Sequence, residues 1–243
     1  MADAPRPAFY ALAAGGWRDY VTLLHPPYTA WNLSYVAIGA ALAPALHAGR
    51  TIPTLVAFFL AVGIAAHALD ELHGRPLGTE IPSRTLVALT VLSLGGAVAI
   101  GIYGAITVNA WIVLFVVMGA LAVVAYNAEL AGGRFHGDLQ FAIAWGAFPV
   151  LTGYFAEAES TSLAAVVAAC AAALLSLAQR RLSNQVRDVR RRVVRIEGRL
   201  TRPNGDKEPV TRETLIGAEE RALRLLAASI VAFAVALVIM RVA

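Results

Sequence analysis

Ionisable side chains close the second of several long apolar runs in this sequence. On a helix, His67 and Glu71 are four residues apart and share a face, and Asp70 lies beside them. Carboxylates here could hold Mg²⁺, which prefers oxygen ligands and usually keeps substrate phosphates as co-ligands. The alternative is an ordinary solvated helix end, in which Asp70 or Glu71 pairs with Arg75.

A second polar group follows the sixth apolar run. Asn184 and Asp188 are also four residues apart, and several arginines surround them, among them Arg181 and Arg187. A single carboxylate among arginines is normally neutralised by them. Asp188 therefore becomes a metal ligand only with a partner from elsewhere, and the end of the second run could supply that partner.

A third group comprises Tyr126 and Asn127, followed by a glycine-rich turn over residues 132–138. The glycines indicate a tight turn. Tyr126 and Asn127 could contact a substrate, but an aromatic residue at the membrane interface and a helix-end cap explain them equally well.

The composition indicates what kind of protein must position these groups. Hydrophobic residues make up 58% of the 243 residues and charged residues only 15%, whereas a soluble domain has about 25% charged residues. The mean hydropathy is +0.66. These values exclude a disordered chain, a nucleic-acid-binding tail and an ordinary soluble enzyme. They predict an integral membrane protein whose surroundings are lipids, with no nucleic-acid partner.

The apolar runs predict an all-α transmembrane bundle that forms one domain over residues 1–243. Each run has about 18–23 mainly apolar residues, enough to cross roughly 30 Å of hydrocarbon. None alternates with a period of two, as strands of a membrane barrel would. The seven predicted spans are Tyr28–Leu46, Ile52–Leu72, Thr85–Ala105, Val108–Leu130, Leu139–Ala156, Leu163–Leu182 and Ala222–Val242.

The basic residues predict the orientation of the bundle. Of the 20 lysines and arginines, only Arg50 and Arg241 fall in the loops on one side. By the positive-inside rule, the N-terminus and the polar loops after the second, fourth and sixth spans face the cytoplasm, and the C-terminus faces out.

The basic stretch at 183–212 has an apolar stripe, formed by Val186, Val189, Val193, Ile196 and Leu200. The spacing predicts a cytoplasmic amphipathic helix. It would either lie on anionic headgroups or cover a pocket for an anionic substrate. A turn at 202–206 would end it, and Thr211 is the expected N-cap of the last helix.

Four segments carry motifs in a familiar order and spacing. They are His25-Pro26-Pro27-Tyr28-Thr29, the loop Arg75-Pro76-Leu77 with Ile81 and Ser83, the region from Tyr126 to Tyr154 with Gly137, Gly146 and Gly153, and Asn184-Gln185-Val186-Arg187-Asp188-Val189. Together, over about residues 20–192, they make the chain resemble the UbiA superfamily of intramembrane prenyltransferases.

The resemblance implies a helical fold around a cavity in which Mg²⁺ and a prenyl diphosphate are held. The prenyl group would pass to an aromatic or other lipid-soluble acceptor. Asp70 and Asp188 would be the catalytic residues, and Asp70, Glu71 and Asp188 would be the Mg²⁺ ligands. Substrate would be bound by basic and polar side chains, namely Arg75, Arg181, Arg187, Asn184, Tyr28, Asn32, Tyr126 and Asn127.

The sequence departs from the family in its carboxylates and its length. The family's two motifs are N-x-x-x-D-x-x-x-D and N-D-x-R-D-x-x-x-D. Here about one Asp remains in each, and Gln185 and Arg192 stand at two Asp positions. Such a site would hold one Mg²⁺ or none, with arginines neutralising part of the phosphate charge. The family usually has nine helices, so a second copy or a partner subunit would complete the cavity.

Two other functions fit the same features. One is a noncatalytic lipid- or quinone-binding protein on this fold, and the other is cyclisation of a prenyl diphosphate, which shares the first step. A rhodopsin is excluded because the only lysine, Lys207, lies outside the spans. Five scattered histidines are too few for a membrane di-iron hydroxylase.

Overall fold

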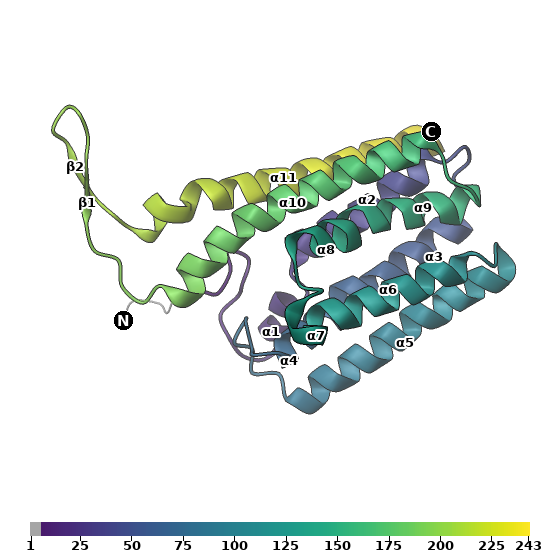
Figure 1. The fold of residues 1–243 in the computed structure, drawn as a ribbon, viewed down its shortest axis with the longest axis horizontal. Coiled ribbons are helices and arrows are strands. Elements are labelled where there is room, and N and C mark those ends of the chain that lie inside the picture. The colour runs from purple at the N-terminus through teal and green to yellow at the C-terminus, as the bar shows by residue number, and fades with distance from the viewer. Residues whose placement is uncertain (1–5) are drawn as a thin grey trace.

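Long apolar helices dominate the structure, a computed structural model that describes residues 6–243 (Figure 1). Five helical segments are long and apolar enough to cross a membrane, namely Ala48–Leu72, Ser83–Thr107, Asp138–Ala158, Leu163–Arg192 and Arg212–Val242. The other two predicted spans coincide with shorter helices, α2 (Pro26–Leu42) and α6 (Ile112–Asn127). The all-helical class is thus confirmed, with five segments that could cross a membrane, while seven crossings remain a prediction.

Three of the long segments are single helices, α5 (Ser83–Thr107), α10 (Leu163–Arg192) and α11 (Arg212–Val242). The other two are each interrupted by a π-helical stretch, which is often found at functional sites. The first runs through α3 (Ala48–Phe58), η1 (Phe59–Ala66) and α4 (His67–Leu72), and the second through α8 (Asp138–Ala142), η2 (Ile143–Ala147) and α9 (Phe148–Ala158). Two short helices complete the helical part of the chain. They are α1 (Trp17–Leu23), which precedes α2, and α7 (Leu130–Gly133), which lies between α6 and α8.

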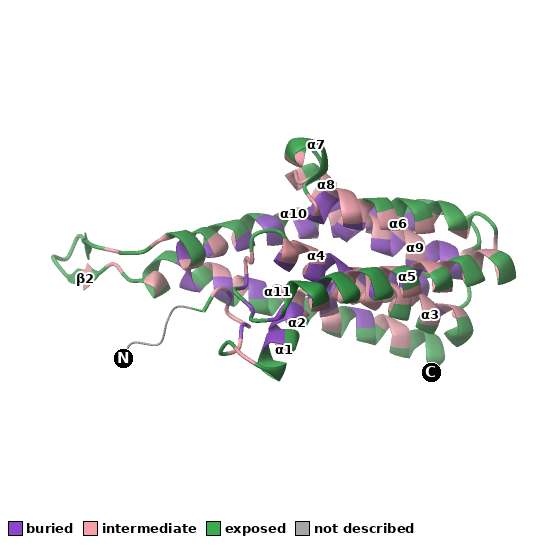
Figure 2. Cartoon of the chain, turned by 90° about the horizontal axis from the view of Figure 1, so that it is seen from below, coloured by how far each residue is buried: buried purple, intermediate pink, exposed green. Residues whose placement is uncertain are grey.

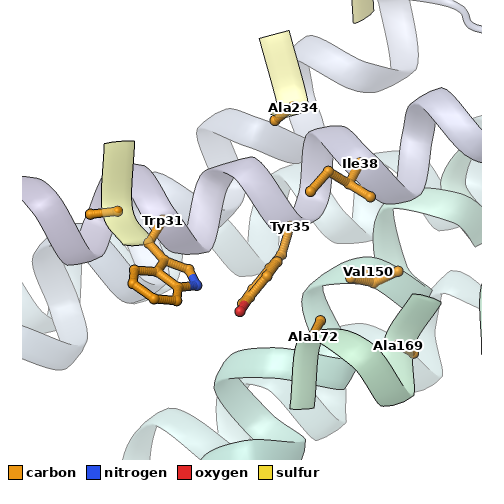
Figure 3. Close-up of a cluster of buried hydrophobic side chains, with 8 residues drawn as sticks. Trp31, Tyr35, Ile38, Val150, Ala169, Ala172 and Ala234 are labelled. Carbon is orange, nitrogen blue, oxygen red and sulfur yellow. The ribbon is translucent and has the colours of Figure 1, made fainter. Parts of the chain in front are cut away.

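Glycines let α2 and α9 pack backbone against backbone. A Cβ on Gly39 would lie 2.1 Å from the carbonyl oxygen of Val150, and one on Gly153 would lie 2.2 Å from that of Val36. Close approach through small residues is the usual way helices associate in lipid. Beside this contact, the larger side chains of α2 meet alanines of α10 and α11 in a buried cluster (Figure 3).

The loops lie at two opposite ends of the helical bundle. At one end, which we call the basic end, Asp138 pairs with Arg180 and Arg190 donates to the carbonyl of Arg6. At the opposite end, His47 contacts Glu157 and Arg241 donates to the carbonyl of Ala43. All three polar groups of the sequence therefore lie at the basic end, as the alternating topology requires. Which end faces the cytoplasm remains a prediction.

The prediction that the basic stretch is helical through residue 200 is wrong beyond Arg192. α10 ends at Arg192, and the chain continues into a small hairpin of β1 (Arg199–Thr201) and β2 (Lys207–Pro209). The predicted turn at 202–206 joins the strands, with Gly205 at a φ of 87°. The adjacent β-branched pair Val193 and Val194 favours extended backbone. The hairpin projects beyond the bundle and is largely exposed (Figure 2).

Only the first part of the apolar stripe lies on a helix. Val186 and Val189 are buried against Ile216 and Leu223 of α11, so this face packs on protein rather than on headgroups. The prediction that Thr211 caps the last helix is confirmed, because its hydroxyl accepts from the Thr214 N–H.

Candidate functional site

Asp70 joins the first two polar groups of the sequence. It lies in the last turn of α4, and the charged groups that act on it are, from strongest to weakest, Arg187, Arg191, His136 and Glu71. Arg187 and Arg191 are one helical turn apart on α10. One carboxylate thus faces two guanidinium groups, which leaves net positive charge beside it.

Aromatic rings form one side of this site. The imidazoles of His25 and His67 stack with centroids 4.0 Å apart and planes 20° apart. The Tyr10 ring lies 5.3 Å from His25 and 5.5 Å from Tyr28. We call the whole set the polar cluster, which consists of Tyr10, His25, Tyr28, His67, Asp70, Arg187 and Arg191.

Local backbone features set the two histidines face to face. His25 has a φ of 45°, an uncommon left-handed conformation for a residue with a Cβ, and it precedes Pro26 at the start of α2. Such strained residues gather at functional sites. His67 follows the π-helical stretch, and its Nδ1 lies 3.1 Å from the carbonyl oxygen of Gly63.

Burial keeps the groups at the edge of the cluster uncharged at neutral pH. Burial lowers the pKa of His25 well below its ordinary value, and the charges of His67, Arg191 and Arg187 lower it further. Burial likewise raises the pKa of Tyr10. Both rings therefore act as hydrogen-bonding groups rather than as ions.

The N-terminal segment covers the cluster. Arg191 donates from Nε to the carbonyl of Pro7, and Arg224 lies 5.0 Å over the ring of Phe9. The Leu12 N–H is bonded to the hydroxyl of Thr22 on α1. Because residues 6–12 contact α1, α10 and α11, they close the cluster from the basic end.

Glu71, a predicted Mg²⁺ ligand, is occupied by the loop after α4. Its side chain is fully buried, and it accepts hydrogen bonds from the Leu77 N–H at 2.9 Å, the Thr79 N–H at 2.8 Å and the Thr79 hydroxyl at 2.9 Å. Its oxygens therefore hold the loop.

Arg75, predicted to bind diphosphate, fixes the same loop. Its guanidinium donates to the carbonyls of Thr79 at 3.2 Å and Ile81 at 2.6 Å and to the Ser83 hydroxyl at 2.8 Å. The alternative of a pair between Arg75 and Asp70 or Glu71 does not form. The motif that carries the family resemblance here thus builds a rigid loop beside Asp70.

Asp188 does not join Asp70. Its side chain is 59% exposed and lies 3.6 Å from Arg192. Arg181 is also exposed and pairs with Asp138, while Asn184 accepts from Arg187. Of the predicted residues on α10, only Arg187 reaches the polar cluster.

The donor set does not fit a dedicated Mg²⁺ site. Throughout residues 6–243, no three His, Cys, Asp or Glu side chains are grouped so that they could hold a metal ion. Glu71 is bonded to the loop, Asp188 lies outside the cluster, and Asp70 faces two arginines.

Tyr126 belongs to a neighbouring network built by Arg180. The guanidinium of Arg180 donates to the Tyr126 hydroxyl, to Asp138 at 2.7 Å and to the His136 carbonyl at 2.8 Å. Asn127 is buried and bonds the Val123 carbonyl, so it acts within its own helix. Asp70 and Arg187 both interact electrostatically with Tyr126, which makes the network adjacent to the cluster.

The predicted acceptor residues on α2 lie deeper in the bundle. Tyr28 interacts with Gln179 of α10. Asn32 donates from Nδ2 to the Tyr28 carbonyl, but its Oδ1 is buried and has no partner in residues 6–243. These two side chains extend the polar surface inward from the cluster.

Several residues that the structure brings to the site were not among the predicted site residues. These are Tyr10, His25, His67, Gln179, Arg180 and Arg191. A signal for the arginines existed, because Arg180, Arg187 and Arg191 are spaced seven and four and share a helix face. Tyr10 carried no signal, since its position depends on the fold of the N-terminal segment.

An apolar cavity of about 150 Å³, partly open to its surroundings, lies between α3, η1, α5, α6, η2 and α9. Glycines make room for it along α5 and α6, among them Gly101 and Gly119. Two of its lining residues, Val62 and Trp145, also pack against Tyr126. One end of the cavity therefore lies next to the polar groups.

Comparison with known proteins adds no family to this description. No family model matches the chain, and neither a curated protein nor a solved structure matches it.

Proposed function

We propose that this chain is a UbiA-like membrane prenyltransferase that binds a prenyl diphosphate through Arg187 and Arg191. The observation that carries the proposal is the pair of arginines facing one carboxylate at the end of an apolar bundle. The sequence motifs at His25 and Arg75 flank this place. The apolar cavity beside Tyr126 offers space for the isoprenyl chain.

The arginines supply the chemistry that the first step needs. Diphosphate leaves with the electrons of the bond to the prenyl carbon, so negative charge develops on its oxygens. Guanidinium groups match phosphate oxygens with paired N–H donors and remain charged at all relevant pH values. Placed in advance, they stabilise the charge as it forms. Asp70 interacts electrostatically with both arginines, and Tyr28 and Asn32 would line the side from which an acceptor approaches.

Binding and pyrophosphate release test the proposal directly. The purified protein in lipid nanodiscs is mixed with farnesyl and geranylgeranyl diphosphate. We expect binding and acceptor-dependent release of pyrophosphate, and at least tenfold weaker binding in Arg187→Gln and Arg191→Gln. Arg192→Gln is the matched control, because Arg192 lies on the same helix and is 84% exposed. Absence of binding with every chain length would overturn the proposal.

A noncatalytic lipid- or quinone-binding protein is the second candidate, and the dispersal of the carboxylates favours it. Diphosphate binding without pyrophosphate release would support it. Release of pyrophosphate without an added acceptor, together with a cyclic hydrocarbon product, would indicate a cyclase. The cytoplasmic orientation of the basic end, and completion of the cavity by a second copy or a partner subunit, stay predictions. Protease accessibility of the 199–209 hairpin in sealed vesicles and the mass of the solubilised particle test them.

A further inference from the structure

An open groove of about 470 Å³ runs between α2 and α11 near the basic end. Apart from Arg224 its lining is apolar, and it includes Phe9 of the N-terminal segment, Pro27 and Ala30 of α2, and Ala228, Val231 and Ala232 of α11. The three α11 residues share one helix face, and Ala228 and Ala232 are exposed. The groove therefore opens to the surroundings of the bundle.

Arg224 brings a positive charge without a counter-ion to this groove. Its guanidinium lies 5.0 Å over the ring of Phe9, which is a cation–π contact. Among residues 6–243, Arg224 makes no hydrogen bond and no ion pair. The carboxylate one turn earlier on α11, that of Glu220, already accepts two hydrogen bonds from Arg190. The N–H donors of Arg224 are thus free to bind an anion.

The position of Arg224 along α11 matches the level of lipid headgroups. α11 is one of the helices that could cross a membrane. From Arg224 to Val242 it rises about 27 Å at 1.5 Å per residue, which is close to the roughly 30 Å of a hydrocarbon layer. With this part of α11 in the hydrocarbon, Arg224 would lie among headgroups, and Ala228 and Ala232 would lie beside acyl chains.

We propose that this groove binds one anionic phospholipid, whose phosphate contacts Arg224 and one of whose acyl chains lies along the alanines of α11. Guanidinium groups match phosphate oxygens with paired N–H donors. The ring of Phe9 holds the guanidinium in place before the lipid arrives, so less conformational freedom is lost on binding. The apolar lining favours a lipid over a soluble phosphate. This site does not depend on the proposed prenyl transfer.

Native mass spectrometry of the full-length protein in detergent, which resolves the first bound lipid, tests the headgroup contact. The probes are dioleoyl phosphatidylglycerol and dioleoyl phosphatidylcholine, which share their chains and differ in net charge. We expect the anionic lipid to bind about fivefold more tightly, as about 1 kcal/mol for one basic residue implies. Arg224→Gln should abolish this preference. Arg221→Gln is the matched control and should keep it, because Arg221 pairs with Glu213.

A second pair of variants tests the apolar part of the groove. Ala228→Leu fills the groove and leaves Arg224 in place. It should weaken phosphatidylglycerol binding roughly fivefold, as losing contact with one or two buried methylene groups would. Ala171→Leu adds the same atoms at an exposed position of α10 and should bind as the wild-type protein does. Glycerol 3-phosphate, which carries a phosphate but no chains, should not compete with the lipid.

The contrary results are equally definite. Equal binding of the two lipids by the wild-type protein would overturn the inference whether or not the variants fold. A preference that Arg221→Gln loses as fully as Arg224→Gln would show only a general attraction to the basic end. Unchanged binding in Ala228→Leu would place the acyl chain elsewhere, and competition by glycerol 3-phosphate would show an anion site that selects no lipid. Each of these three results would also overturn the site.

Discussion

The guanidinium of Arg180 on α10 is bonded to the carboxylate of Asp138 at the start of α8, with Nε 2.7 Å from Oδ1. The same group donates to Tyr126 and to the His136 carbonyl and lies over the ring of Phe141. One buried side chain thus connects both ends of the turn between α6 and α8. The turn itself contains strained backbone, with positive φ at Glu129 and Ala131.

Replacing Arg180 by lysine should loosen this turn. Lysine keeps the charge but loses the planar fork that reaches three partners at once. We expect a loss of about 1–3 kcal/mol of stability, measured as a lower melting temperature in detergent. Arg181→Lys is the control, because Arg181 pairs with the same Asp138 but its side chain is 71% exposed. Equal melting temperatures for the two variants would show that the fork is unimportant.

Glu71 should matter for the loop after α4 and not for divalent cations. In Glu71→Ala, the N–H groups of Leu77 and Thr79 lose their acceptor, at a cost of about 2–4 kcal/mol. The measurement is the rate of proteolysis within residues 73–82, which should rise. Glu129→Ala, at an exposed carboxylate of the neighbouring loop, serves for comparison and should cleave like the wild-type protein. If the loop of the wild-type protein resisted proteolysis only when magnesium is present, Glu71 would instead be a metal ligand.

The contact between α2 and α9 should tolerate no added methyl group. In Gly39→Ala the new Cβ meets the Val150 backbone, so we expect about 1–3 kcal/mol of destabilisation. Gly95→Ala adds the same atom to α5 in open space and should leave the melting temperature unchanged or raise it. A Gly39→Ala protein as stable as Gly95→Ala would mean that the two helices lie farther apart.

Diphosphate binding should not depend on magnesium. Chelation of divalent cations is expected to change the affinity for farnesyl diphosphate by less than about twofold, since the cluster holds a single carboxylate between arginines. Asp70→Asn should bind the anion more tightly, because Arg187 and Arg191 lose a competing charge, and Asp188→Asn should bind as the wild-type protein does. A magnesium requirement that disappears in Asp70→Asn would establish the metal site implied by the family resemblance.

Stability should fall on mild acidification because of His25. The pKa of His25 is far below its ordinary value of 6.5 in the folded protein, so below that pH the unfolded chain takes up a proton that the folded one does not. The contribution of His25 to the free energy of unfolding is therefore fully present above pH 6.5. It declines as the pH falls below that value, by up to about 1.4 kcal/mol per pH unit. Melting temperatures between pH 7.5 and 5 should show a shallower decline in His25→Phe than in His73→Phe. If the melting temperatures of the two variants fell in parallel with pH, His25 would be exposed to water in the folded protein.

Much of the bundle could be predicted from composition and patterning. Long apolar runs require helices in lipid, because only internal hydrogen bonds can satisfy their backbone there. The close contact of α2 and α9 at Gly39 and Gly153 could not be predicted from the sequence, since contact between distant helices depends on how they pack. The end of α10 was also missed, because the helical spacing of Val193, Ile196 and Leu200, three and four residues apart, competes with the extended preference of Val193 and Val194.

The site was predicted less completely than the fold, for a physical reason. Periodicity places Asp70 and Arg187 at helix ends but does not say which rotamers or neighbours they have. Glu71 and Arg75 could serve a ligand or the loop backbone, and only their hydrogen bonds decide that they hold the loop. The role of His25 depends on a left-handed backbone conformation and on a ring from another helix, neither of which is encoded in local spacing.

As one of the predicted spans, α6 would be unusually short, which would have a consequence for the surrounding bilayer. Its 16 residues rise only about 24 Å, less than the roughly 30 Å of a typical hydrocarbon layer, whereas the adjacent 25-residue α5 exceeds that thickness. Such hydrophobic mismatch is relieved by local thinning of the bilayer or by tilt. Since α6 lines the apolar cavity, lipid tails beside it would be compressed where that cavity approaches Tyr126, and a membrane-dissolved substrate would have a shorter path to the polar cluster.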